Sequence, residues 1–432
     1  MENYCRSFRD PVHGFIPVTE AECKIIDTWP FQRLRRIKQL GMTYLVYHGA
    51  EHTRFGHSLG VMHQASRVFD ALMTTKEKDL DVGWSGDEVS RLRQLLRIAC
   101  LCHDLGHTPF SHAGEDRDLL PDGLRHEDYS AAIVLAKEGK AGEVGRAIQE
   151  VGPRLQDITC QDVADLITGE PLGGGAAFLQ EIVSGELDAD RMDYLQRDSI
   201  YCGVRYGGFD NDRLIETLTL TKDPVGGNPV IAIEKDGVQA AEGLILARYF
   251  MFSQVYFHRV RRAYDHHLRS FLKATLPNGR YPAPDDLDGF LSFDDVAVQN
   301  MLCECGEKPK QESDHARRIL ERDHYHVAYE TREHPNPRQI KRWKEQLLPG
   351  VYERFPGKVA SDSAETAAEG FSRRSREFCV VQRDPSKPVR SVEEESDLIS
   401  RLQPLTRIRL LADRSLCSEV REYCSSLTLD VG

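Results

Sequence analysis

Imidazole and carboxylate side chains at four positions form a set of donors suited to a divalent metal ion. His57, the adjacent pair His103 and Asp104, and Asp190 lie far apart in the chain, so only folding can bring them together. Nitrogen and oxygen ligands of this kind hold metal ions that acidify water and polarise phosphate oxygens. These residue types therefore predict a metal site for phosphoester hydrolysis. Iron, manganese, nickel and zinc are all compatible with them.

The segment from His103 to His112 is the densest part of this pattern. It reads His-Asp-Leu-Gly-His-Thr-Pro-Phe-Ser-His, and its glycine and proline end a helix directly after the His-Asp pair. The break lets His107 and His112 face the space beside the ion, where a phosphate would lie. Glu115 follows His112 by three residues and is placed to hydrogen-bond its imidazole and keep it protonated. His112 is then a candidate proton donor to a leaving oxygen.

A single histidine is more often a surface or core residue than a ligand. Here five histidines lie at the ends of predicted helices or in turns beside them: His57, His103, His107, His112 and His126. Their grouping with Asp104 and Asp190 favours a functional site over five unrelated side chains.

The secondary-structure elements that position these residues are predicted to be mostly helices. Apolar residues recur at spacings of three and four over 58–73 and 87–102, with Ser85 and Asp87 as N-cap candidates for the second segment. Further helices are predicted over 126–138, 178–201 and 237–276. Strand-forming residues predict a hairpin over 9–19 and a β-hairpin insertion at about 222–236.

The C-terminal part has a mixed pattern. Charged helices continue to about residue 346, and small polar residues over 357–370 predict a linker. Strands at 378–382 and 407–412 and helices at 393–401 and 415–423 follow. We therefore expect a mostly α-helical core over 1–350, with small β-hairpin insertions, and a small α+β lobe over 371–432.

Composition excludes several classes of protein. The 432 residues are 40% hydrophobic and 29% charged, as in ordinary soluble domains. No stretch approaches the roughly 20 apolar residues of a membrane helix, and the polar start lacks a signal-peptide pattern, so we expect a cytoplasmic protein with no membrane partner. The spacing of the eleven cysteines suits neither zinc knuckles nor a disulfide framework. A formal net charge of -12 opposes indiscriminate binding to nucleic acid.

Several blocks of this sequence resemble the HD-domain phosphohydrolases. They are Asp10-Pro-Val-His-Gly14, residues 31–41, His52-Thr-Arg-Phe-Gly-His-Ser-Leu-Gly60, the segment from His103, residues 186–194 and Arg261-Arg-Ala-Tyr264. The blocks are most similar to the deoxynucleoside triphosphate triphosphohydrolases, which include the vertebrate sterile-alpha-motif/HD enzyme and its bacterial relatives. The resemblance implies a helical HD-domain core, without a preceding sterile-alpha-motif domain. It also implies hydrolysis of dNTPs at the α-phosphate to deoxynucleoside and triphosphate.

The resemblance assigns roles by position in these motifs. His57, His103, Asp104 and Asp190 match metal ligands, whereas Asp188 matches a structural residue. His112, Glu115 and His126 fall on catalytic positions, and Arg54 and His107 on positions that touch the α-phosphate. The residues around sugar and phosphates are Gln39, Leu40, Arg191, Tyr194, Asp198 and Tyr264. Leu40 and Tyr264 would crowd a 2′-hydroxyl, which implies a preference for deoxynucleotides, although core packing also explains both.

Three further residues match a regulatory pocket at subunit junctions of relatives. These are Asp27, Gln32 and Arg35, for which solvated pairing on a helix face is an equally good interpretation. Activation by a nucleotide is therefore a hypothesis. Relatives form tetramers or hexamers, so we expect a homo-oligomer, and Mg²⁺ on the substrate phosphates is compatible with the chemistry. Gly56, Glu115 and Arg191 depart from the vertebrate pattern, and the planar fork of arginine changes how phosphate is held.

Two other functions fit the same residues. The first is cleavage of single-stranded DNA or RNA, for which two basic clusters could follow a strand: Arg33, Arg35, Arg36 and Lys38, and Arg259, Arg261 and Arg262. Such clusters more often solvate a surface or line a triphosphate pocket. The second is a non-catalytic scaffold that binds nucleotide and assembles oligomers. The complete set of metal ligands argues against the scaffold.

Overall fold

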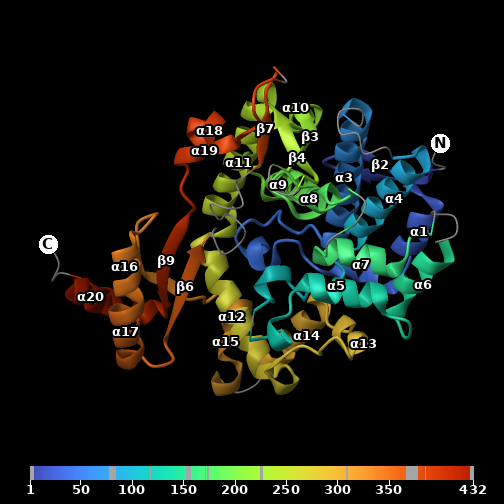
Figure 1. The fold of residues 1–432 in the computed structure, drawn as a ribbon. Coiled ribbons are helices and arrows are strands. Elements are labelled where there is room, and N and C mark those ends of the chain that lie inside the picture. Colours follow the sequence, from blue (N-terminus) through green and yellow to red (C-terminus); the bar gives the residue numbers. More distant parts are fainter. Residues whose placement is uncertain are drawn as a thin grey trace.

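The computed structural model describes residues 4–76, 84–116, 118–151, 157–170, 172, 175–223, 227–307, 310–365, 378–384 and 386–428. Within these ranges helices dominate, and three small sheets lie among them (Figure 1). The predicted mostly α-helical class is confirmed. Residues 366–377, which include the end of the predicted linker and the start of the predicted lobe, lie outside the described ranges.

The N-terminal segment forms the predicted hairpin. Strand β1 (Tyr4–Asp10) pairs antiparallel with β2 (Gly14–Thr19), and the Asp10 carboxylate closes the turn by accepting from the backbone N–H groups of Val12 and His13. Thr19 and Glu22 then form a capping box that starts α1 (Glu20–Ile26), which α2 (Trp29–Arg33) follows. The two hydrogen bonds to Asp10 thus define the turn at the tip of the hairpin.

Five helices of the core carry or surround the predicted site. They are α3 (Arg54–Lys76), α4 (Gly86–Cys102), α5 (His126–Leu135), α7 (Cys160–Thr168) and α9 (Ala189–Cys202). Helix α3 packs on α4 and α9, and α7 packs on α4 and α5. The predicted N-cap Ser85 is confirmed, since Ser85 and Glu88 form a capping box on α4. This packing places the start of α3, the end of α4 and the start of α9 side by side.

Two helices predicted as continuous are interrupted. The segment 178–201 consists of α8 (Phe178–Ser184) and α9, because the chain leaves the helix at Gly185 and Asp188 caps α9 by accepting from the N–H of Arg191. The segment 237–276 consists of α11 (Val238–Met251), a π turn over residues 252–256 and α12 (Arg259–Thr275), with extended backbone at His258. Apolar periodicity continues through both breaks, which is why it does not show them.

The predicted β insertion is also present. Strands β3 (Leu218–Lys222) and β4 (Pro229–Glu234) pair antiparallel, and β4 also pairs in parallel with β7 (Cys379–Val381), which pairs with β8 (Arg390–Ser391). Buried Val392 of α18 (Val392–Glu395) and Ile399 of α19 (Asp397–Arg401) join the main hydrophobic core. The first part of the predicted C-terminal lobe thus packs against the core.

The linker predicted over 357–370 is wrong where the structure describes it. Residues of β6 (Val359–Glu365) pair antiparallel with β9 (Thr406–Ala412), which also pairs with β5 (His326–Glu330). The small residues of β6 suggested a flexible chain, but a buried neighbouring strand supplies the backbone partners. This sheet and helices α16 (Pro337–Arg342), α17 (Leu348–Arg354) and α20 (Cys417–Thr428) share a second hydrophobic cluster, on the left in Figure 1. The division at residues 350 and 371 stays a prediction.

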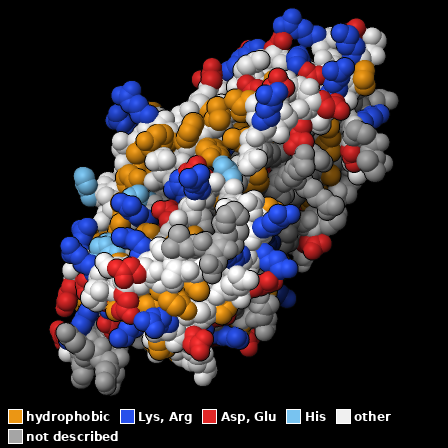
Figure 2. All heavy atoms as spheres, turned by 90° about the vertical axis from the view of Figure 1, so that its left-hand side faces the viewer, with side chains coloured by type: hydrophobic (Ala, Val, Ile, Leu, Met, Phe, Trp, Pro, Cys, Tyr) orange, Lys and Arg blue, Asp and Glu red, His pale blue; other side chains and the backbone are white. Residues whose placement is uncertain are grey.

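The remaining helices are α6 (Gly142–Val151), α10 (Asn211–Thr217), α13 (Leu287–Leu291), α14 (Asp295–Gly306) and α15 (Lys310–Leu320). Among the described residues, none of the helices combines the length and the hydropathy that a bilayer crossing requires. Figure 2 shows one face of the molecule, on which basic and acidic side chains are interspersed around a band of hydrophobic ones.

Candidate active site

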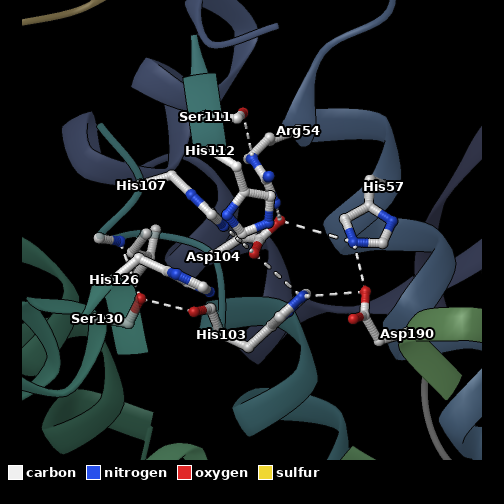
Figure 3. A network of polar contacts seen from close by, with 12 residues as sticks. Arg54, His57, His103, Asp104, His107, Ser111, His112, His126, Ser130 and Asp190 are labelled. Atoms are coloured by element: carbon white, nitrogen blue, oxygen red, sulfur yellow. Dashed lines mark hydrogen bonds and ion pairs between the residues drawn. The ribbon is translucent and has the colours of Figure 1, made fainter. Parts of the chain in front are cut away.

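The four predicted metal ligands meet at the junction of three helices (Figure 3). His57 lies in the first turn of α3, His103 and Asp104 end α4, and Asp190 lies in the first turn of α9. His57 Nε2 is 2.9 Å from Asp190 Oδ1 and 3.6 Å from Asp104 Oδ2. His103 Nε2 is 3.3 Å from Asp104 Oδ1 and 3.9 Å from Asp190 Oδ1. His57, His103 and Asp190 thus bring donor atoms close enough together to hold one metal ion, and the carboxylate of Asp104 lies beside both imidazoles.

The donor atoms fit a divalent cation. The Nδ1 atoms of both rings are already engaged, in His57 with Asp193 and in His103 with the carbonyl of Cys100. The Nε2 atoms are buried and make no well-directed hydrogen bond, which is the arrangement expected of imidazole ligands. Burial alone would lower the pKa of His57, but Asp190 and Asp193 raise it to about 10. The pocket thus attracts positive charge.

Asp193 orients His57 and was missed by the sequence analysis. Its carboxylate lies 2.8 Å from His57 Nδ1 and accepts two hydrogen bonds from Arg197, at 2.8 and 2.9 Å. A Cβ at Gly60 would lie 1.9 Å from Asp193 Oδ1, so this glycine leaves the space that the carboxylate occupies. The spacing of Asp193 from Asp190, three residues along one helix, is the signal that points to it.

A second cluster lies beside the metal ligands and surrounds Glu115. Its two carboxylate oxygens lie 3.0 Å from His112 Nδ1 and from His126 Nδ1. His107 stacks on His126, and His107 Nε2 is 3.2 Å from Asp104 Oδ1. The His112 side chain is 63% exposed, whereas those of His107, Glu115 and His126 are 1%, 14% and 16% exposed. His112 is therefore the imidazole that an incoming molecule can reach.

Local charges set the protonation states. Burial opposes the ionised form of Glu115, but His126 and His112 hold its pKa well below the usual range. Burial also opposes charge on His126, yet Glu115 raises the pKa of His126 to about 9. Burial and the neighbouring Arg54 place the pKa of His107 well below its usual value. At neutral pH, without a bound cation, the cluster combines an anionic Glu115, a cationic His126 and a neutral His107.

Arg54 joins the two clusters. Its guanidinium donates to Asp104 Oδ2 at 2.6 Å and to Ser111 Oγ at 2.7 Å. Arg54 begins α3, and its backbone N–H donates to the carbonyl of Ile37. A buried guanidinium thus lies between the predicted metal ligands and the His112 turn, and a guanidinium is a group that can bind phosphate oxygens.

The turn that carries His112 has a costly backbone. Phe110 and Ser111 have φ values of 58° and 54°, which residues with a side chain rarely adopt. Asp295 accepts from the N–H of Phe110 at 2.7 Å, and Ser111 donates to the carbonyl of Lys38 at 2.6 Å. Asp295 also accepts from the N–H of Lys38. Asp295 lies far from this turn in the sequence, so the sequence analysis did not identify its bonds to the turn.

Arg269 of α12 holds the other side of the same turn. It donates to the carbonyl oxygens of Ala113 at 3.2 Å and His112 at 3.3 Å, and its guanidinium lies 3.7 Å from Asp116. Nothing in the sequence pattern distinguishes Arg269 from other helix-face arginines, so the sequence analysis did not identify it. Asp295 and Arg269 together hold the turn that carries His112.

The residues predicted to contact the substrate have different environments in the structure. Gln39, Leu40 and Tyr264 are buried, and Tyr264 packs on His324. The carboxylate of Asp198 lies 2.8 Å from His52 Nε2 and accepts from Tyr256 at 2.7 Å. Tyr194 is half-buried and makes an edge contact with Tyr256. Arg191 pairs with Asp188 and Glu186. Their contacts with a nucleotide stay predictions.

The predicted regulatory residues lie at the surface near the N-terminal hairpin. Gln32 accepts from Arg35 Nε at 2.9 Å, and the Arg35 guanidinium lies over the ring of Phe55. Asp27 pairs loosely with Arg6 of β1 at 3.7 Å. Gln32 and Arg35 thus touch, and Arg6 is a neighbour that the sequence analysis did not name.

One arginine of each basic cluster named for the nuclease alternative is buried. Arg33 is buried and donates to the backbone carbonyls of His107 and Phe293. Arg261 is also buried and donates to the carbonyl of Tyr256. These cations brace the backbone beside the site and are unavailable to a polynucleotide.

The helical fold and its His-Asp ligand set define a class of metal-dependent hydrolases. The HD domain model matches residues 54–198, and the HD associated region model matches residues 209–408. A phosphohydrolase from Bacteroides thetaiotaomicron, of known structure, superposes with a TM-score of 0.72 at 25% identity over 95% of this chain and 100% of that one. A hypothetical protein from Aquifex aeolicus superposes with a TM-score of 0.71 at 33% identity, over 97% and 99% of the two chains. The chain belongs to the HD-domain phosphohydrolase family.

The matches to curated relatives cover only part of each relative. Uncharacterized protein YwfO of Bacillus subtilis is 41% identical over 257 residues, which cover 59% of this chain and 52% of the relative. Deoxynucleoside triphosphate triphosphohydrolase SAMHD1 of Xenopus laevis is 28% identical over 417 residues, which cover 86% of this chain and 62% of the relative. The chain therefore spans between half and two thirds of the length of these relatives.

Proposed function

We propose that this protein hydrolyses deoxynucleoside triphosphates at the α-phosphate and releases deoxynucleoside and triphosphate. The observation that carries the proposal is the contact between the two clusters. One oxygen of Asp104 lies near His57, a predicted metal ligand, and the other lies near His107, a member of the cluster around Glu115. A phosphate at this junction lies within reach of both. Similarity to SAMHD1 over most of this chain supports dNTPs as the substrate class.

The residues present have distinct tasks in this reaction. His57, His103, Asp104 and Asp190 would hold a divalent transition metal. When bound, that ion would act as a Lewis acid on the phosphate and lower the pKa of water, and iron, manganese, nickel and zinc all suit this donor set. Arg54 places a fixed positive charge beside the α-phosphate and so stabilises negative charge that develops there. Neutral His107 orients an oxygen of the same phosphate by a hydrogen bond.

His112 is the proton donor to the departing 5′-oxygen in this proposal. It is the exposed imidazole of its cluster, and Glu115 fixes its ring through Nδ1, so that Nε2 is turned to the substrate. His126 shares Glu115 and keeps a positive charge behind the reacting phosphate. The bond between the α-phosphorus and the 5′-oxygen breaks, water supplies the new oxygen, and the proton moves to the nucleoside.

Four residues are assigned to recognition of the sugar. Leu40 and Tyr264 would exclude a 2′-hydroxyl, Asp198 would accept from the 3′-hydroxyl, and Gln39 would contact the sugar. Arg191 and Tyr194 would contact the phosphates, on which Mg²⁺ would also bind.

Asp27, Gln32 and Arg35 would form the pocket of an activating nucleotide in a homo-tetramer or homo-hexamer. Native mass spectrometry with and without added nucleotides tests that assembly.

Product analysis tests the reaction directly. Protein loaded with one metal at a time is incubated in ¹⁸O-water with each dNTP, each NTP and labelled single-stranded oligonucleotides, and the products are separated by mass. We expect deoxynucleoside and triphosphate from dNTPs, with the label in the triphosphate, and intact oligonucleotides. Monophosphate and pyrophosphate would contradict the assigned leaving group. Shortened oligonucleotides without triphosphate would support the nuclease alternative instead.

A further inference from the structure

The N-terminal hairpin reaches the carboxylate that orients a metal ligand. His13, at the tip between β1 and β2, has its Nε2 atom 2.6 Å from Asp193 Oδ1, while His57 Nδ1 lies 2.8 Å from Asp193 Oδ2. The side chains of His13 and Asp193 are 4% and 0% exposed. One buried carboxylate is therefore shared between the hairpin tip and His57, 44 residues further along the chain.

The tip is fixed relative to that carboxylate by a closed set of hydrogen bonds. Asp10 Oδ1 accepts from the N–H of His13 at 3.0 Å, and Asp10 Oδ2 accepts from Arg197 Nη1 at 2.8 Å. Arg197 in turn donates twice to Asp193. The backbone that carries His13 is thus attached to the same arginine that holds Asp193, which leaves the imidazole little freedom to move away.

We propose that His13 is a positioning residue of the metal site, acting through Asp193 on His57. The paired donors of Arg197 hold both oxygens of Asp193 from one side. His13 adds a bond to Oδ1 from a different element, which fixes the tilt of the carboxylate. That tilt sets the plane of the His57 ring and hence the direction of its Nε2 atom. Partners that orient an imidazole ligand in this way typically contribute about 10–100-fold to metal affinity.

His63 offers a matched comparison on the same wall of the molecule. Its ring centroid lies 5.3 Å from that of His13, and burial lowers its pKa to about 4. Within the described part of the chain, no hydrogen bond joins His63 to Asp193. Removing His63 changes the packing around His13 but leaves the shared carboxylate intact.

The test measures binding of Mn²⁺ to metal-free protein by isothermal titration calorimetry and by chelator competition. The variants are His13→Ala, His13→Gln, His13→Asn and His63→Ala. The amide nitrogen of glutamine can occupy the place of the imidazole Nε2 and donate to Asp193, whereas asparagine is too short. We expect His13→Ala and His13→Asn to bind about 10–100-fold more weakly. His13→Gln and His63→Ala should stay within about threefold of the wild type.

Two outcomes overturn the proposal: unchanged affinity in His13→Asn, or an equal loss in His63→Ala. Melting of the metal-free variants separates positioning from support of the fold, because a residue that only stabilises the hairpin lowers the melting temperature without changing affinity. If His13→Ala does not fold, the pair His13→Gln and His13→Asn decides.

The inference rests on the proposed metal site and not on the proposed substrate. Wild-type protein that binds Mn²⁺ but releases no triphosphate from dNTPs would contradict the proposed function and leave the role of His13 standing. Wild-type protein that binds no Mn²⁺ would overturn the metal site and this role together.

Discussion

The imidazole of His107 lies flat on that of His126, with ring centroids 3.7 Å apart and planes inclined by 19°. Two cations at this distance would repel each other strongly, so at most one ring is charged. Arg54 beside His107 and Glu115 beside His126 decide which one it is. The stack therefore pairs a neutral ring, next to the proposed metal ligand Asp104, with a cationic ring next to the carboxylate that orients His112.

Replacing Glu115 by glutamine should shift the pH profile of turnover. His126 has a folded pKa of about 9, raised above its ordinary value of 6.5, so its pairing with Glu115 is complete below pH 6.5 and is lost as the pH rises through 9. Without the anion, burial lowers that pKa and the alkaline limb of kcat/KM moves to lower pH. We expect kcat to fall by about 10²-fold or more. An alkaline limb that stays in place would contradict the assigned charges.

Removing one carboxylate ligand should abolish both metal content and turnover. Asp190→Ala and Asp104→Ala each leave two imidazoles with one carboxylate, and we expect a loss of about 10³-fold or more in kcat. Asp188→Asn is the control for metal content, because asparagine at the N-cap preserves the start of α9. Elemental analysis checks the metal and triphosphate release checks the rate. An unchanged rate in Asp104→Ala would favour the scaffold interpretation.

Arg269→Ala should slow the reaction without removing the metal. Loss of its two bonds to the backbone releases the strained turn before His112, so we expect kcat to fall by about tenfold while metal content is retained. Arg269→Lys should recover part of the rate. Lys273→Ala, one turn further along α12, removes only an exposed pair with Asp118 and is the matched control. Equal effects of both alanine variants would refute the bracing role.

Tyr264→Ala should weaken discrimination against ribonucleotides. The ring is fully buried against His324, and its removal opens space where a 2′-hydroxyl would lie. We expect the ratio of kcat/KM for a dNTP to that for the matching NTP to fall by about tenfold. A ratio that does not change would assign Tyr264 to core packing alone.

Ser85→Ala should destabilise the fold and leave the chemistry unaltered. The Ser85 hydroxyl accepts from the N–H of Glu88 at the start of α4, and its loss should lower the free energy of unfolding by about 1 kcal/mol. The proposed metal ligands His103 and Asp104 lie at the other end of the same helix, eighteen and nineteen residues away. Chemical denaturation measures the first effect and kcat per folded molecule the second. A fall in kcat at full folding would show that the cap influences the site.

Sequence-based prediction worked where the information was local. The adjacent His103 and Asp104, with a glycine two residues later, indicated ligands at a helix end, and α4 does end directly before them. Of the two N-cap candidates, Ser85 is the cap and Asp87 lies in the first turn of the helix. It failed where a distant partner decides the outcome. The small residues of β6 form a strand because β9 lies beside them. A local signal was also missed: the helix expected over 178–201 ends before Gly185, and Asp188 caps a new one, while the apolar periodicity continues through the break.

The amino-acid sequence by itself determined which donors are available and which segments are helical, because side-chain chemistry and apolar periodicity are properties of neighbouring residues. Only the tertiary structure decided which imidazole nitrogens face the metal position, which histidine is charged and which is exposed. The facing nitrogen of His57 depends on Asp193, the charges depend on Arg54 and Glu115, and the turn that exposes His112 depends on Asp295 and Arg269. Burial and distance between such groups, which no spacing along a chain records, set their hydrogen bonds and pKa values.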